Sequence, residues 1–517
     1  MAYDFPSSPS VGDQFPPTTK FWTWDGSAWV PTAGLGGTTG PIPEAPTDGR
    51  VYGRQGSTAT WQAVTAGGGI PEAPNDGAIY GRGGNPTPIW TKSVPLAGGT
   101  MTGTLTLSGG PIGVNDAANK GYVDSNAVSY TTPQGLASAN QIIGRQNIYA
   151  APFEAMTDLN LIINGSMQVS QELVTNSLTL INTTQRYVTD GWIAIYNHGA
   201  NTAVFSTAQS SVGGVSPIGV QNGLILTAST ALTAPANGDF AVILQKIEGL
   251  RWARTCLGPT GMAQPLALSF WVNSNVATGN FTVSLRNTSN NRCYTKILNY
   301  SSAGVWQYFS IVIPAETTGT WNYDNTSAVT VGFAFACGSN FFGTDATWNT
   351  TNAFGVSGQS NFFATNGNSV QISGVSLFVG SEGPSAARTP HIVRPYNQDL
   401  QLCMRYYEKS FPNNVAVAQN AGFTGCFAFA QDITAGNIQI VGTVCLSVSK
   451  RTTGYTFTLY NPAAANAQIR NASKSSDWTA SASDRVGNNM VSIIGTTAGG
   501  SAIGDSSYVQ WTADARL

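Results

Sequence analysis

Short stretches in which apolar and polar residues alternate fill the middle of the chain. Examples are PLALSFWVNSN at 265–275, GVWQYFSIVIP at 304–314 and SVQISGVSLFVG at 369–380, and turn residues such as Asn, Gly and Ser separate them. Alternation with a period of two places one set of side chains on each face of a β-strand. Many short strands at regular intervals are typical of two antiparallel sheets that pack face to face. We therefore expect a jelly-roll-like antiparallel β-sandwich over residues 159–397.

The pattern changes after the sandwich. The segment DLQLCMRYYEKSF at 399–411 is the best helical candidate in the chain. Leu400, Met404 and Tyr407 would fall on one side of that helix. Strand-like stretches such as NIQIVGTVCLSV and GYTFTLYN follow it. We therefore predict a helix and a smaller C-terminal β-domain over residues 398–517.

The chain is long and has few charges. Its 517 residues exceed the roughly 250–300 that one hydrophobic core accommodates, so several domains are expected. Charged residues make up 10% of the chain, against about 25% in ordinary soluble proteins. Low charge combined with alternating apolar residues favours extended β-structure over disorder, because disordered chains are usually rich in charge.

Charge and hydropathy also exclude several partners. A net charge of −2 and a pI near 5.7 give no basic surface for nucleic acid. No segment approaches the roughly 18 apolar residues that a membrane helix needs. The opening MAYDFPSSPS has neither the basic region nor the apolar core of a secretory signal. We expect neither nucleic-acid binding nor membrane insertion.

Two copies of one motif lie near the N-terminus. IPEAPTDGRVYGRQG at 42–56 recurs as IPEAPNDGAIYGRGG at 70–84, and a tryptophan, Trp61 or Trp90, follows each copy. Proline and Asp-Gly are turn residues, and the flanking segments have strand character. Residues 37–94 are therefore predicted to form two Pro/Gly-rich hairpin repeats, each too small to be stable alone.

An aromatic hairpin is expected before the repeats, in residues 1–36. FWTWDGSAWV at 21–30 places an Asp-Gly turn between two aromatic segments. The indole rings could stack on sugars, but a hairpin this small has no other apolar surface to bury. We therefore favour packing within the hairpin. The tryptophans concerned are Trp22, Trp24 and Trp29.

Residues 95–126 combine a threonine-rich hairpin with a short helix. The sequence is PLAGGTMTGTLTLSGGPIGVNDAANKGYVDS over 95–125, and Asn115 is a candidate N-cap. Both pieces are too short to be stable singly, whereas three copies could bury their apolar residues around one axis. Residues 127–158 are polar and are interpreted as a connector. The predicted trimer contacts are Leu105, Leu107, Ala118, Tyr122 and Val123.

Three segments together resemble bacteriophage tail-fibre and related virion-appendage proteins. They are residues 95–125, NLIINGSMQVSQ…YVTDGW at 160–171 and 187–192, and ISGVSLFVGSEGPSAARTP…QLCMRYYEKS. The resemblance implies a fibrous virion component, usually homotrimeric, whose N-terminal side faces the particle. Within 95–125 the matching residues are Pro95, Gly98, Gly99, Met101, Gly103, Leu105, Lys120, Tyr122 and Val123.

The expected function is therefore that of a structural virion protein in the tail or a tail appendage, assembled in the host bacterial cytoplasm. Its N-terminal region would attach to other tail or neck proteins. Its distal β-domains would contact a glycan or protein of the host surface. Two alternatives remain: a neck, collar or baseplate appendage without a receptor role, and a polysaccharide-degrading tail enzyme.

The residues give little support to the enzyme alternative. Glycoside hydrolysis needs two carboxylates across a cleft, and no spacing singles out a pair among 26 acidic residues. GDSS at 504–507 is similar to the nucleophile block of one esterase class, but no histidine follows His391 and the other histidine is His198. We expect no catalytic residues, no metal site and no cofactor.

Aromatic residues in two polar segments, 336–354 and 359–367, are candidates for surface binding. Exposed aromatic side chains among Asn, Ser, Thr and Gly are typical of adaptable binding loops. The alternative, which we rate slightly higher, is that they close the end of the sandwich or pack between subunits. They are Phe341, Phe342, Trp348, Phe354, Phe362 and Phe363.

Six cysteines lie in the second half of the chain. None forms a CxxC pair, and only His198 and His391 could supply imidazole, so we do not expect a zinc site. Buried free thiols are favoured, and disulfides formed after release into an oxidising medium are the alternative. The cysteines are Cys256, Cys293, Cys337, Cys403, Cys426 and Cys445.

Overall fold

The computed structural model divides the chain into two compact units, Met1–Gln134 and Gly135–Leu517. The predicted trimer contacts in 95–126 and nearly all of the connector lie outside the described residues. Those described are 7–15, 21–32, 52–54, 61–63, 80–83, 89–92 and 158–517, except 200–201, 213–218, 259–260 and 382.

In the first unit, an antiparallel sheet contains the aromatic hairpin. Its order is β1 (Gln14–Phe15), β2 (Phe21–Trp24), β3 (Trp29–Thr32). The carboxylate of Asp25 accepts hydrogen bonds from the backbone N–H groups of Ser27 and Ala28, both at 2.8 Å. Gly26 has a φ of +106°, and the rings of Trp24 and Trp29 lie 5.7 Å apart. The predicted hairpin with its Asp-Gly turn is confirmed.

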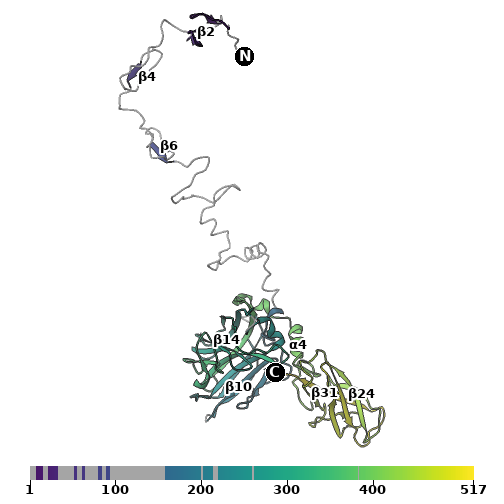
Figure 1. Cartoon of the computed structure of the whole chain (residues 1–517). Helices are drawn as coiled ribbons and strands as arrows, with labels where there is room; N and C mark the ends of the chain where they lie inside the picture. The colour runs from purple at the N-terminus through teal and green to yellow at the C-terminus, as the bar shows by residue number, and fades with distance from the viewer. Residues whose placement is uncertain are drawn as a thin grey trace. The chain divides into compact units, whose positions relative to one another are not determined.

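The two repeats form short hairpins, of which Figure 1 labels strands β4 and β6, and the registers of the two hairpins correspond. In the first, β4 (Tyr52–Arg54) pairs with β5 (Trp61–Ala63) and places Arg54 opposite Trp61. In the second, β6 (Tyr80–Gly83) pairs with β7 (Ile89–Lys92) and places Arg82 opposite Trp90. The repeat seen in the sequence is therefore also a repeat of backbone pairing.

Two antiparallel sheets form the predicted sandwich in the second unit. The first has the order β20 (Thr347–Asn349), β16 (Cys293–Tyr300), β15 (Gly279–Asn287), β18 (Ser327–Cys337), β13 (Phe240–Glu248), β10 (Trp192–Asn197), β9 (Arg186–Thr189). The second has the order β17 (Gln307–Ile313), β14 (Leu266–Ser274), β22 (Ser369–Val379), β12 (Asn222–Thr230), β11 (Val204–Ser211), β8 (Leu178–Thr179).

Short elements complete the sandwich. A parallel pair joins β19 (Phe342–Gly343) to β21 (Gly355–Val356). The helical turns are α3 (Gly249–Trp252), η2 (Ala253–Thr255), η3 (Ser339–Phe341) and η4 (Ala386–Ile392).

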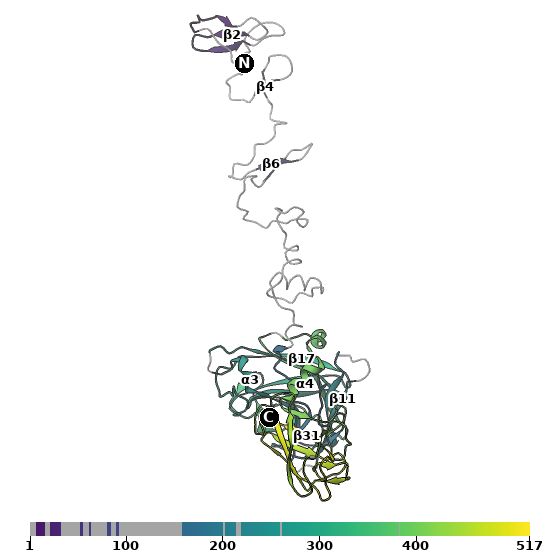
Figure 2. The same ribbon diagram turned by 90° about the vertical axis from the view of Figure 1, so that its right-hand side faces the viewer.

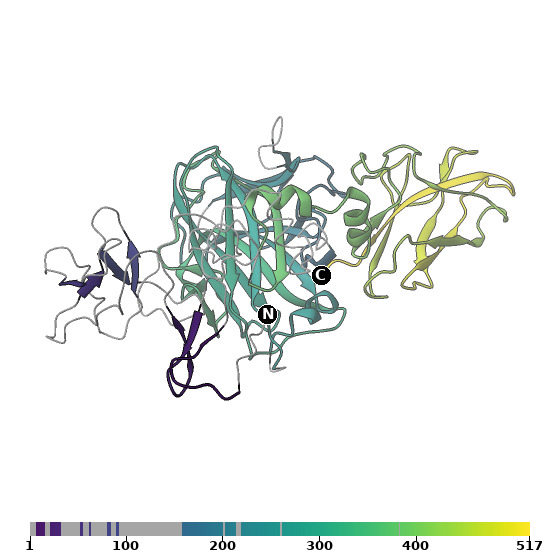
Figure 3. The same cartoon turned by 90° about the horizontal axis from the view of Figure 1, so that it is seen from above.

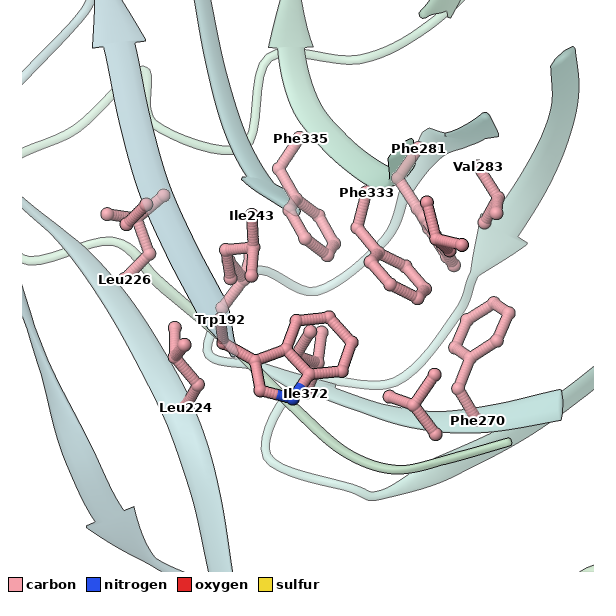
Figure 4. Packing of buried hydrophobic residues seen from close by; sticks show 14 of the residues in the cluster. Trp192, Leu224, Leu226, Ile243, Phe270, Phe281, Val283, Phe333, Phe335 and Ile372 are labelled. Atoms are coloured by element: carbon pink, nitrogen blue, oxygen red, sulfur yellow. The ribbon is translucent and has the colours of Figure 1, made fainter. Parts of the chain in front are cut away.

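Large apolar side chains from both sheets fill the space between them (Figure 4). Trp192, Phe270, Phe281 and Phe333 are fully buried, and the rings of Phe270 and Phe333 meet edge to face at 4.8 Å. Each such side chain contributes about 1.5–3 kcal/mol by leaving water. This core is what the alternating pattern of the sequence predicts.

The C-terminal β-domain is built around one long strand, β31 (Ser506–Asp514). It pairs with β23 (Tyr407–Lys409), β24 (Phe427–Ala430), β26 (Thr456–Tyr460) and β27 (Arg470–Asn471), which also pairs with β28 (Ser476–Asp477). A second sheet has the order β25 (Ile438–Cys445), β30 (Met490–Thr496), β29 (Ala480–Asp484). Trp478, Ile493 and Val509 are buried in this domain.

The predicted helix is shorter than expected. Helix α4 spans Tyr396–Met404 and lies where the sandwich meets the C-terminal β-domain (Figures 2 and 3). The prediction that Tyr407 continues the helical face is wrong. Residues Tyr407 to Lys409 instead pair with β31, and this distant strand overrides the local helical pattern.

Candidate functional site

The aromatic segments mostly close the sandwich instead of forming an exposed surface. Phe362 and Phe363 are fully buried in the main core, where they pack against Phe335 and Phe205 at 5.6 and 4.9 Å. Phe354 is also buried. The prediction of a binding surface is wrong for these three residues, because sheets distant in sequence cover them.

The other three aromatic residues are half-buried and packed. Phe341 stacks on Phe354 at 4.5 Å, and Phe342 joins the same cluster. The indole N–H of Trp348 donates to the carbonyl of Pro314 at 2.9 Å, and its ring meets Trp321 edge to face. Packing therefore accounts for the positions of all six aromatic residues.

All six cysteines are free thiols, and the favoured expectation of buried thiols holds for three of them. Cys293, Cys337 and Cys403 are buried, Cys256 and Cys426 are half-buried, and Cys445 is exposed. Burial raises the pKa of the Cys337 thiol to about 12. A thiolate is therefore disfavoured there.

Hydrogen bonds hold the GDSS segment within the C-terminal β-domain. The Asp505 carboxylate accepts hydrogen bonds from the side-chain amide of Asn471 at 2.9 Å and from the backbone N–H of Ala502 at 2.9 Å. The hydroxyl of Ser507 is buried and donates to the side chain of Gln431. Within the described residues, no cluster of three or more His, Cys, Asp or Glu could hold a metal ion. The expectation that the chain is not an enzyme stays a prediction.

The NLIINGSMQ segment closes one end of the sandwich. The side-chain amide of Asn164 donates to the carbonyls of Val169 at 2.7 Å and Asp190 at 3.0 Å, and the backbone carbonyl of Asn164 accepts the indole N–H of Trp192 at 2.9 Å. Gly165 is needed here, because a Cβ at this position would lie 2.0 Å from the carbonyl oxygen of Val375. These contacts tie the segment to Asp190 and Trp192, which lie more than 20 residues further along the chain.

A buried ion pair joins the sandwich to the start of the C-terminal region. Glu248, at the end of β13, accepts hydrogen bonds from Arg405 Nε at 2.8 Å and Nη2 at 2.6 Å. The hydroxyl of Tyr406 donates to the same carboxylate at 2.6 Å. The Glu248 side chain is 1% exposed, and both of its carboxylate oxygens accept hydrogen bonds within the protein.

A second set of contacts lies beside it. The guanidinium of Arg516 lies between the rings of Tyr187 and Tyr407, 4.3 and 4.4 Å from their centroids, and pairs with the carboxylates of Glu172 and Asp514. Residues from four separate segments meet here. We call the contacts of Glu248 and Arg516 together the joint between the two β-domains.

Asp190 is a buried acid at the joint. Its carboxylate accepts hydrogen bonds from the backbone N–H of Gln171 at 2.7 Å and from the side-chain amide of the same residue at 2.8 Å. Burial raises the pKa of Asp190 to about 6. Among the described residues, no cation bonds directly to this carboxylate to offset the effect of burial. Lys409 is buried nearby, and burial lowers its pKa to about 8.

An open groove of about 710 Å³ lies next to the joint. Helix α4 supplies one side and residues 447–449, which follow β25, supply the other. The guanidinium of Arg394 is already bonded to the carbonyls of Ile162 and Asn160, at 2.9 and 2.6 Å, and pairs with Asp399 at 3.4 Å. The lining residues are Asp158, Arg394, Gln398, Gln401, Leu402, Ser447, Val448 and Ser449.

Four polar side chains of the groove are exposed and not used within the protein. Gln398 and Gln401 on α4, and Ser447 and Ser449 opposite, make no side-chain hydrogen bond with other described residues. Side-chain amides and hydroxyls both donate and accept hydrogen bonds. Sequence reasoning missed this groove because its two sides are more than 40 residues apart, and no local motif marks either side.

Comparisons with known proteins show no family. No protein family matches the sequence, and no curated protein is detectably similar to it. Among the described residues, no helix is both long and apolar enough to cross a membrane.

Several solved structures match part of the chain at low similarity. One is the enzymatically active domain of tailspike protein 4 from bacteriophage CBA120, at 13% identity and a TM-score of 0.22, covering 43% of this chain and 22% of the tailspike chain. Another is the family 11 carbohydrate-binding module from Clostridium thermocellum in complex with a mixed-linked tetrasaccharide, at 12% identity and a TM-score of 0.22, covering 40% and 99%. TmCBM61 in complex with β-1,4-galactotriose has 8% identity and a TM-score of 0.20, covering 43% and 98%. At such low identity and TM-score, these matches say nothing about the ligands of this chain.

Proposed function

We propose that the chain is a structural component of a bacteriophage particle, of the tail-fibre type. Its N-terminal region attaches to other tail or neck proteins, and its two β-domains contact the host surface. It assembles as a homotrimer in the bacterial cytoplasm and has no enzymatic activity. This proposal extends the resemblance found in the sequence.

One observation gives the proposal its main support, namely the pair of repeated hairpins before the large β unit. Their strands have three residues each in the first repeat and four in the second. Hairpins of this size are marginally stable in water and need a partner surface. Association with further copies or with another virion protein supplies that surface.

The test is to locate the chain in the intact particle. Antibodies against the C-terminal β-domain should label a fixed site on purified particles in electron microscopy. Deletion of residues 37–94 should give particles that lack the label, although the β-domains of the variant remain folded. Unlabelled wild-type particles that contain no copy of the chain would refute the proposal. Labelled particles that adsorb to host cells normally after the chain is removed would favour the appendage without a receptor role.

A further inference from the structure

We infer that the groove between α4 and residues 447–449 binds a neutral glycan segment. The inference rests on the proposed function for the source of that glycan, the host cell surface. It places the contact with the host glycan at a site that neither the aromatic segments nor the sequence motifs indicate.

The chemistry of the groove matches a chain of sugar hydroxyls. The amides of Gln398 and Gln401 and the hydroxyls of Ser447 and Ser449 face solvent without partners among the described residues. A sugar hydroxyl can donate to and accept from each of these groups. Leu402 and Val448 add apolar surface between the polar groups.

The charges of the groove favour a neutral ligand over an acidic one. Arg394 lines the groove, but its side chain is 4% exposed and is already paired with Asp399 and with two backbone carbonyls. The exposed carboxylate of Asp158 is therefore the charge left at the rim. A glycan that contains carboxylates or phosphates would meet a like charge and no available cation among the described residues that line the groove.

The two sides of the groove are held in place before any ligand arrives. The backbone N–H of Ser447 donates to the Glu408 carboxylate at 2.8 Å. The buried ammonium of Lys450 pairs with the same carboxylate and donates to the carbonyl of Met404, at the end of α4. A preformed site avoids the entropy cost of ordering a loop on binding. The volume of about 710 Å³ suits a ligand of a few sugar units.

Titration calorimetry on the full-length chain tests the inference. The probes are three neutral hexasaccharides (from cellulose, from starch and from mixed-linked β-glucan) and the acidic hexagalacturonate. We expect at least one neutral probe to bind and the acidic probe to bind more weakly. None of the described residues that line the groove is aromatic, so the affinity should be weak and should come mainly from hydrogen bonds.

The key variant is the double substitution Gln398→Ala and Gln401→Ala. Loss of two amides should weaken binding about tenfold, since each net hydrogen bond changes the dissociation constant several-fold. Both residues are exposed on α4, and alanine is a better helix former than glutamine, so the fold is retained. Gln221→Ala is the matched control, because Gln221 is an exposed glutamine of the sandwich outside the groove lining.

Three results would overturn the inference: no neutral probe binds, the double variant binds as well as the wild type, or the acidic probe binds more tightly. The particle test is independent of these results. If the chain is found on the particle but one of these three results is obtained, the proposed function stands and the groove is not the glycan site.

Discussion

The substitution Glu248→Ala tests the joint between the two β-domains. It removes a carboxylate that accepts three hydrogen bonds, two from Arg405 and one from Tyr406. The two donors stay behind in the same place, one charged and one neutral. We expect the sandwich and the C-terminal β-domain to lose much of their mutual stabilisation.

The size of the effect follows from burial. Removal of one partner from a buried ion pair costs about 3–5 kcal/mol. The Arg405 side chain is 30% exposed, so water compensates part of that loss. The Tyr406 hydroxyl is buried and adds about 1–3 kcal/mol when it is left without an acceptor. The two contributions overlap, and together they predict a loss of about 3–4 kcal/mol in the free energy of unfolding.

Urea denaturation monitored by tryptophan fluorescence measures this loss, because both β-domains contain buried tryptophans, among them Trp192 and Trp478. Hydrogen exchange then shows whether amides of the C-terminal β-domain open more often. Asp484→Ala is the control, because its ion pair with Arg485 is exposed and contributes about 1 kcal/mol or less. Equal unfolding midpoints for the two variants would refute the role assigned to Glu248.

Three further predictions concern other parts of the chain. Burial raises the pKa of Asp190 to about 6 from its ordinary value of 3.8, so the contribution of the protonated side chain to stability is fully present below pH 3.8 and is lost as pH rises through 6. Asp190→Asn should remove up to about 3 kcal/mol of this pH dependence, measured by urea midpoints. Phe362→Ala should lower the free energy of unfolding by about 3–5 kcal/mol, because the ring is fully buried. Leu105→Asp or Tyr122→Ala should weaken the trimer in light scattering more than Asn75→Ala does.

Each of these predictions has a result that contradicts it. For Asp190, the contradicting result is that the urea midpoints of the Asp190→Asn variant depend on pH between about 4 and 7 in the same way as those of the wild type. A Phe362→Ala protein with normal stability but lost adsorption to host cells would return that residue to the role of a binding surface. A folded monomer of the wild-type chain at low concentration would exclude residues 95–125 as an intersubunit core.

The sequence predicts local features of the fold well. Alternation with a period of two locates the sandwich strands, since one face of each strand must be apolar to bury a core. Asp25 and Gly26 mark the first hairpin turn, because their turn geometry depends on neighbouring residues alone. The two repeats are recognisable for the same reason.

Features that depend on distant residues could not be predicted in this way. Tyr407 follows a helical pattern, yet pairing with β31, about 100 residues further along, makes it part of a strand. Phe362 has polar neighbours in sequence, yet Phe335 and Phe281 surround it in space. The groove is a third case, because neither α4 nor residues 447–449 carries a signal in the sequence, and contacts of Glu408 and Lys450 bring the two segments together.

The joint also limits how such a chain can exchange parts with a relative by recombination. Its contacts link Glu172 and Tyr187 at the start of the sandwich with Arg516 at the end of the C-terminal β-domain. A crossover between these positions would give a hybrid in which Arg516 meets a foreign surface, and a buried guanidinium without its carboxylates is costly. Residues 158–517 should therefore be inherited as one block.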